Sequence, residues 1–129
     1  MNDRPVQRAQ ELRVYKQAMV LAMAIFDVTA TFPTSERYSL TDQIRRSSRS
    51  ICANLAEAWQ KRLYRAAFVS KLSDSAGEAA ETTVWLEFAE ECGYLPPAEA
   101  ATLSEQARQV TAQLVAMMTR PEPWLLNRQ

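Results

Sequence analysis

The chain has 129 residues, 15 basic and 15 acidic side chains, and no histidine. The zero net charge excludes a global field that would draw the molecule onto nucleic acid or anionic lipid, so any such attraction must be local. The absence of histidine removes the commonest acid–base catalyst near neutral pH and the commonest zinc ligand, and it excludes the Glu-x-x-His di-iron sites of helical bundles.

The first predicted element is a helix over residues 9–32, which ends before Pro33 because a residue that precedes proline is pushed out of helical geometry. The segment before it lacks an apolar signal core, and no stretch approaches the roughly 20 apolar residues that cross a bilayer. We therefore expect a cytoplasmic protein with no membrane contact. The side chains expected to face the core recur at helical spacing: Leu12, Tyr15, Met19, Ala22, Ile25 and Phe26.

A second helix is predicted over residues 40–62, with Ser39 as its N-cap and Asp42 favouring its positive end. It has an apolar face with one small polar member, at Leu40, Ile44, Ser48, Ile51, Leu55 and Trp59.

A third helix is predicted over residues 65–92, closed by a left-handed Gly93. A fourth is predicted over residues 98–119, closed by Pro121. The expected core positions of these two helices are Phe68, Leu72, Ala76, Ala79, Thr83 and Leu86, followed by Leu103, Ala107, Val110, Leu114 and Met117.

Four amphipathic helices joined by short connections predict an all-α protein, an antiparallel up-down-up-down four-helix bundle that forms one domain over residues 1–129. Residues 120–129 are expected to be a non-helical tail. Trp124 and Leu125 in this tail must dock either on their own bundle or on a neighbouring copy. Cys52 and Cys92 lie within helical patterns and are expected to be free thiols, with no metal or cofactor.

A ridge of polar side chains accompanies the apolar face of the second helix. Small hydroxyls and amides in such a ridge indicate close helix approach and hydrogen bonds, either inside the bundle or between subunits. An ordinary solvated stripe is the alternative interpretation. The ridge consists of Gln43, Ser47, Ser50, Asn54 and Glu57.

Charge is segregated along the chain, with basic residues between positions 37 and 71 and acidic residues between positions 74 and 105. A hairpin would bring Arg45 and Arg49 level with Glu81 and Glu78. One interpretation is therefore that the two clusters neutralise each other within one chain. The functional alternative is a phosphate-binding patch that continues through the following turn, where Tyr64 offers a stacking surface. The patch would consist of Arg45, Arg46 and Arg49, extended by Lys61, Arg62 and Arg65.

The third helix carries a second stripe, displaced from its core face. It contains two aromatic side chains, which either anchor a contact with an adjacent copy or pack under the Trp124 tail. The stripe consists of Asp74, Glu78, Glu81, Trp85 and Phe88.

Several short segments in order resemble the four helix bundle protein family that is also called 23S rRNA intervening sequence proteins. The resemblance runs over roughly residues 10–118. The segments are Phe32-Pro33, Tyr38-Ser39-Leu40, Gln43-Ile44-Arg45-Arg46-Ser47, Ser50-Ile51, Asn54-Leu55-Ala56-Glu57, Glu78, Glu81 and Gly93-Tyr94-Leu95.

This resemblance implies a bundle that forms ring-like homopentamers and has no enzymatic activity. It also implies kinship with the accessory variability protein of diversity-generating retroelements, which binds its reverse transcriptase and has a basic surface suited to nucleic acid.

We therefore predict a non-enzymatic, homo-oligomeric accessory or scaffold protein that contacts RNA, DNA or a nucleic-acid enzyme through Arg45, Arg46 and Arg49, with no small-molecule substrate. The expected subunit contact residues are the polar ridge of the second helix with Glu78, Glu81, Trp85 and Phe88. The alternative from another class is a small metal-free enzyme that holds an anionic metabolite with Arg45, Gln43 and Glu57.

Overall fold

The computed structural model describes residues 5–126, which form α-helices and short 3-10 helices and contain no strand in this described part. The predicted all-α four-helix bundle is confirmed. The main helices are α1 (Arg13–Thr29), α2 (Leu40–Gln60), α3 (Arg65–Glu91) and α4 (Pro97–Thr119).

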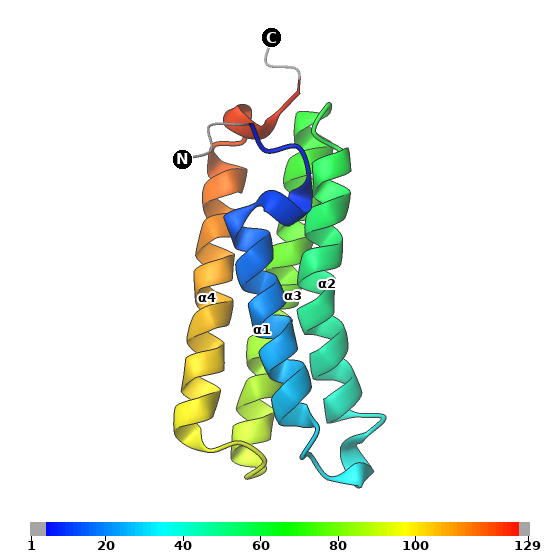
Figure 1. The fold of residues 1–129 in the computed structure, drawn as a ribbon, viewed down its shortest axis with the longest axis vertical. Helices are drawn as coiled ribbons and strands as arrows, with labels where there is room; N and C mark the ends of the chain where they lie inside the picture. The colour runs from blue at the N-terminus through cyan, green and yellow to red at the C-terminus, as the bar shows by residue number, and fades with distance from the viewer. Residues whose placement is uncertain (1–4, 127–129) are drawn as a thin grey trace.

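The four helices run alternately up and down the bundle (Figure 1). Each helix packs on two neighbours, α1 and α3 both lying between α2 and α4. One end carries the connections from α1 to α2 and from α3 to α4. The other end carries the α2–α3 turn together with the entering and leaving segments of the chain (Figure 1).

The first predicted helix is interrupted. A 3-10 turn, Ala9–Glu11, is followed by Leu12 with extended backbone (φ −68°, ψ 138°), and only then does α1 begin. Glu11 to Leu12 therefore forms a corner rather than a continuous helical turn.

The predicted core face of α1 was also partly wrong. Met19 and Phe26 are 41% and 40% exposed, and the small Ala18 is fully buried instead. The reason is that α1 is apolar around most of its circumference, so spacing alone does not select the inward side. The buried side chains of α1 are Val14, Ala18, Leu21, Ala22, Ile25 and Thr29.

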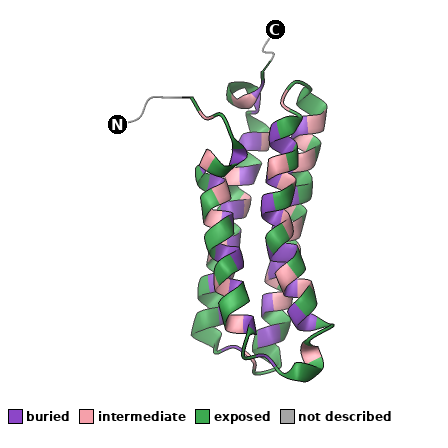
Figure 2. Ribbon diagram, turned by 45° about the vertical axis from the view of Figure 1, so that its right-hand side comes forward, coloured by how far each residue is buried: buried purple, intermediate pink, exposed green. Residues whose placement is uncertain are grey.

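The core faces predicted for α2 and α4 are confirmed, because every side chain predicted to point inward on those two helices is buried. Figure 2 shows buried segments recurring along the length of the helices. On α3, Ser75 and Thr82 are fully buried, whereas the predicted Ala76 and Thr83 are half-buried. The α3 core therefore contains the hydroxyl side chains of Ser75 and Thr82 in place of the predicted Ala76 and Thr83.

The helix ends are capped by two different devices. The predicted cap Ser39 makes no side-chain bond to the α2 backbone; its hydroxyl donates to Glu36 Oε1 (2.5 Å), which also accepts from the Leu40 N–H (3.3 Å). Glu36 is therefore the capping side chain. Gly93 does adopt the predicted left-handed conformation (φ 77°), and the Tyr94 N–H closes the turn onto the Ala89 carbonyl (2.8 Å).

The C-terminal segment docks on its own bundle, which was one of the two expected outcomes. Its residues Glu122–Trp124 form a single 3-10 turn rather than wholly irregular chain. The Trp124 ring lies 6.3 Å from the Trp59 ring, Leu125 is buried, and the Leu126 N–H donates to the Arg62 carbonyl (3.2 Å). The expected tail residues 127–129 lie outside the described part.

Candidate functional site

The seam between α2 and α3 is held by buried hydroxyls from the predicted polar ridge. Ser47 Oγ and Thr82 Oγ1 are 2.9 Å apart and buried, and Ser75 Oγ donates to the Ile51 carbonyl (2.8 Å). Such short side chains let the two helices approach closely. Ser47 therefore serves the inside of the bundle.

The other members of the ridge are less buried, and Ser50 lines a groove among the arginines of α2. Gln43, Ser50 and Asn54 are half-buried, and Asn54 donates to the Ser50 carbonyl (2.9 Å). Glu57 is exposed and pairs with Lys71 of α3 (3.5 Å). The structure thus brings the ridge next to the predicted acidic and aromatic stripe of α3.

That stripe borders a groove of about 410 Å³ between the start of α2 and the end of α3. The Trp85 and Phe88 rings are 6.0 Å apart, and the Trp85 indole N–H donates to Glu81 Oε2 (3.2 Å). Phe88 remains 53% exposed. The Trp124 tail lies at the opposite end of the bundle, so the alternative that it covers this pair is wrong.

Carboxylates crowd the same surface. Burial raises the pKa of Glu78, and the negative charges of Glu81 and Asp74 raise it further, while Arg46 acts in the opposite direction. We call Glu78, Glu81, Trp85 and Phe88 the acidic–aromatic face. Its charges repel one another within a single chain, so this face favours a cationic partner.

A second groove, of about 400 Å³, follows the outer side of α2 and is lined by arginines. One acid, Asp42, also lines it. Among residues 5–126, none of these arginines forms an ion pair with a carboxylate. We call this the arginine groove; its arginines are Arg37, Arg45, Arg46 and Arg49.

Contacts with α1 hold two of these arginines in place. Arg45 Nε donates to Thr29 Oγ1 (2.8 Å) and a second nitrogen donates to the Phe26 carbonyl (3.2 Å). The Arg45 guanidinium lies 4.6 Å from the centre of the Phe26 ring, and that of Arg49 lies 5.8 Å from it. The groove is thus partly preorganised, with a fixed cation over an aromatic ring.

The expected pairing of Arg45 and Arg49 with Glu81 and Glu78 is wrong. Both arginines turn toward α1, because Ser47 occupies the side of α2 that meets α3. Arg46 is the arginine whose charge reaches Glu78.

The predicted extension of the arginine patch lies elsewhere. Helical rise places Lys61 about 18 Å from Arg49, at the other end of α2. The Arg62 guanidinium lies 3.7 Å from the centre of the Trp59 ring and donates to the Trp59 carbonyl (2.8 Å). Arg65 forms an ion pair with Glu122. Arg65 therefore helps to secure the tail, and none of the three side chains lines the arginine groove.

An exposed apolar stripe on α1 was missed at the level of sequence. Met19, Met23 and Phe26 share one side of the helix, with Val20 beside them, and all four are at least 40% exposed. The run of apolar residues around the whole of α1 was the signal that one side would stay uncovered.

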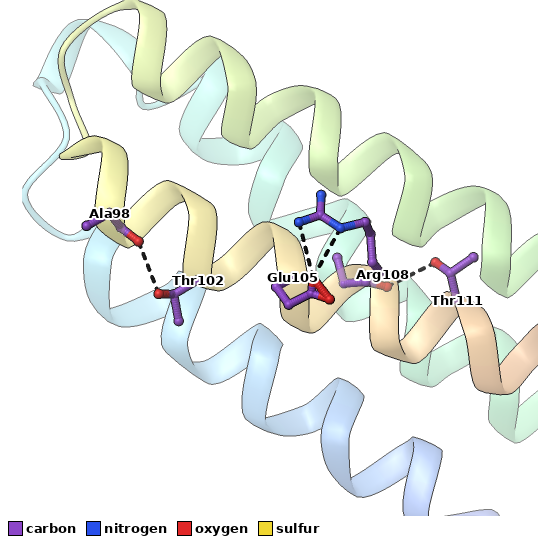
Figure 3. Close-up of polar contacts among 6 residues, drawn as sticks. Ala98, Thr102, Glu105, Arg108 and Thr111 are labelled. Atoms are coloured by element: carbon purple, nitrogen blue, oxygen red, sulfur yellow. Dashed lines mark hydrogen bonds and ion pairs between the residues drawn. The ribbon is translucent and has the colours of Figure 1, made fainter.

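On the outer surface of α4, several polar side chains bond within their own helix (Figure 3). Thr102 donates to the Ala98 carbonyl and Thr111 to the Ala107 carbonyl, each at 3.0 Å. Arg108 pairs with Glu105 (3.3 Å). The surfaces that combine charged and aromatic side chains lie on α1, α2 and α3.

The residues of the alternative enzyme hypothesis point to separate places. Arg45 lines the arginine groove, Gln43 lines the groove beside Phe88, and Glu57 pairs with Lys71. Within the described chain, no group of three or more acidic or cysteine side chains is placed to hold a metal ion. In the same part, none of the helices combines the length and the apolar character that a membrane crossing requires.

Comparison with known proteins identifies a matching family and a similar solved structure. The family described as 23S rRNA-intervening sequence protein matches residues 10–116. The crystal structure of a protein with unknown function from the S23 ribosomal protein family of Bacteroides thetaiotaomicron is similar, with a TM-score of 0.73 and 25% identity. The alignment covers 81% of this chain and 97% of that one. No curated protein matches the chain.

Proposed function

The chain belongs to the 23S rRNA-intervening sequence protein family, and from this premise we propose that it is a non-enzymatic scaffold protein that assembles with copies of itself. The acidic–aromatic face is the contact surface, flanked by Gln43 of the polar ridge. The assembly is a ring, with five copies as the family resemblance implies.

The observation that carries this proposal is the pair of rings on α3, of which Phe88 is exposed and Trp85 is half-buried. Trp85 and Phe88 lie side by side over a groove, and the chain's own tail docks at the far end of the bundle. Exposed aromatic side chains beside an open groove are typical anchors of protein interfaces. A second protein surface would remove them from water.

Light scattering tests the proposal directly. The wild-type chain at micromolar concentration is expected to show a multiple of its 14.6 kDa mass, and Phe88→Glu is expected to shift the population at least tenfold toward the monomer. Tyr64→Glu is the matched control, because Tyr64 is also an exposed aromatic but lies at the other end of α3. A wild-type monomer would refute self-assembly.

A second candidate function is supported by the arginine groove. A groove with four arginines, one acid and no internal ion pair suits the phosphates of RNA or DNA, whether free or held by a nucleic-acid enzyme such as a reverse transcriptase. Fluorescence anisotropy with a single-stranded RNA across a salt series tests it. Arg46→Gln is expected to weaken binding and flatten the salt dependence, while Arg108→Gln, whose arginine is already paired, is the control. Absent binding at low salt would remove this candidate.

A further inference from the structure

Two surfaces of the bundle have complementary properties. The acidic–aromatic face lies along the α2–α3 seam and carries Glu78 and Glu81. The opposite charge lies along the α1–α2 seam, at Arg45 and Arg49. Because α2 borders both seams, the two surfaces are adjacent sides of one molecule and look in different directions.

The surface on α1 and α2 combines cations with apolar groups. Arg45 and Arg49 lie over the Phe26 ring, and Met23 and Met19 continue the same side of α1 at helical spacing. Methionine side chains adapt readily to the shape of a partner. We call Met19, Met23, Phe26, Arg45 and Arg49 the receiving face.

We propose that the acidic–aromatic face of one copy docks on the receiving face of the next copy, so that the contact is head-to-tail. This rests on the self-assembly proposed above and adds which surface the two rings meet. Trp85 and Phe88 pack against Met19 and Met23. Glu78 and Glu81 pair with Arg45 and Arg49 of the neighbour.

Charge complementarity and apolar area favour a second copy over nucleic acid as the occupant of the receiving face. An RNA backbone would pair with the arginines but would leave the exposed side of Met19 and Met23 in water. An acidic surface with aromatic rings satisfies both parts at once. The acidic–aromatic face of a second copy is such a surface.

The angle between the two faces also decides whether the assembly closes into a ring or grows as a filament. Adjacent sides of a four-helix bundle meet at about a right angle, so each head-to-tail contact turns the next copy by a similar amount. A turn of about 90° closes a ring after about four copies, and a turn of about 72° closes a ring of five, whereas a contact without closure would produce a filament.

A mixing experiment with two variants tests the head-to-tail contact. The first variant, Glu81→Lys with Phe88→Lys, damages only the acidic–aromatic face. The second variant, Met23→Ser with Arg49→Ser, damages only the receiving face and gives it no negative charge that could pair with the new lysines. Each variant alone is expected to be a monomer, while an equal mixture is expected to form a one-to-one dimer of about twice the monomer mass, because one intact face of each kind remains.

Native mass spectrometry distinguishes the outcomes. If the second variant assembles like the wild type, the receiving face is unused. If the mixture stays monomeric, no contact joins the two faces. Either result overturns the head-to-tail contact. A monomeric wild type would instead refute self-assembly itself. Circular dichroism checks folding, and Phe88→Ser or Met23→Ser alone replaces a double variant that fails to fold.

Discussion

Tyr94 Oη donates a hydrogen bond to Glu36 Oε2 at 2.8 Å, which ties the connection after α3 to the connection after α1. The same carboxylate accepts from the Ser39 hydroxyl and the Leu40 N–H. These three donors, Ser39 first, hold the pKa of Glu36 below its ordinary value of 4.5. The bond to Glu36 in turn raises the pKa of Tyr94 to about 12.

Tyr94→Phe is therefore expected to lower the free energy of unfolding at pH 7. A carboxylate with a lowered pKa stabilises the fold above 4.5, and this stabilisation is lost as the pH falls through its value in the folded state. The difference between wild type and Tyr94→Phe should shrink over that range. Urea unfolding at a series of pH values measures it. Tyr38→Phe is the control, because Tyr38 is 86% exposed, and a difference that stays constant with pH would contradict the assignment to Glu36.

The bond between Ser47 and Thr82 predicts a coupling between two buried side chains. Ser47→Ala and Thr82→Val should each lower the free energy of unfolding by about 1 kcal/mol, because each leaves a buried partner with fewer bonds. The double variant should cost less than the sum of the two. Strict additivity in a chemical unfolding series would show that the hydroxyls do not act together.

The docked tail predicts a local loss of stability. Trp124→Ala is expected to lower the free energy of unfolding by about 2 kcal/mol, because it removes a half-buried ring from its contact with Trp59. Thermal unfolding measures the effect. Leu126→Ala, at a side chain 64% exposed, should change the melting temperature little. Equal effects of the two variants would contradict the docking.

The sequence predicts the fold better than it predicts the faces. On α2 and α4, polar and apolar side chains alternate clearly, and their inward sides follow from spacing alone. On α1, Met19 and Ala18 are both apolar, and tertiary packing buries Ala18 and leaves Met19 exposed.

The candidate surfaces were likewise predicted only in part from residue spacing. The stripe containing Trp85 and Phe88 followed from helical spacing, since two large rings stood off the core side of α3. The direction of Arg45 did not, because its partners Thr29 and Phe26 lie on another helix that the linear sequence does not place. Contacts between helices depend on how the helices are rotated about their own axes, and neighbouring residues along one chain do not reveal that rotation.

The two cysteines provide a chemical test of both the core and the proposed contact. Burial raises the pKa of Cys52 to about 11, so little thiolate exists at pH 8 and the side chain is inaccessible in the native state. Cys92 is exposed and lines the groove beside Trp85 and Phe88. A thiol reagent should therefore modify one cysteine quickly in the native protein and the second only after denaturation.

The rate at Cys92 also reports on assembly. If a neighbouring copy covers the groove, modification of Cys92 should slow several-fold as the protein concentration rises through the range of association, while Phe88→Glu should abolish this dependence. Cys92→Ser identifies the fast site, and Cys52→Ser identifies the slow one. A Cys92 rate that is independent of concentration in a protein shown by light scattering to be oligomeric would place the contact away from this groove, since a covered thiol cannot react as freely as an open one.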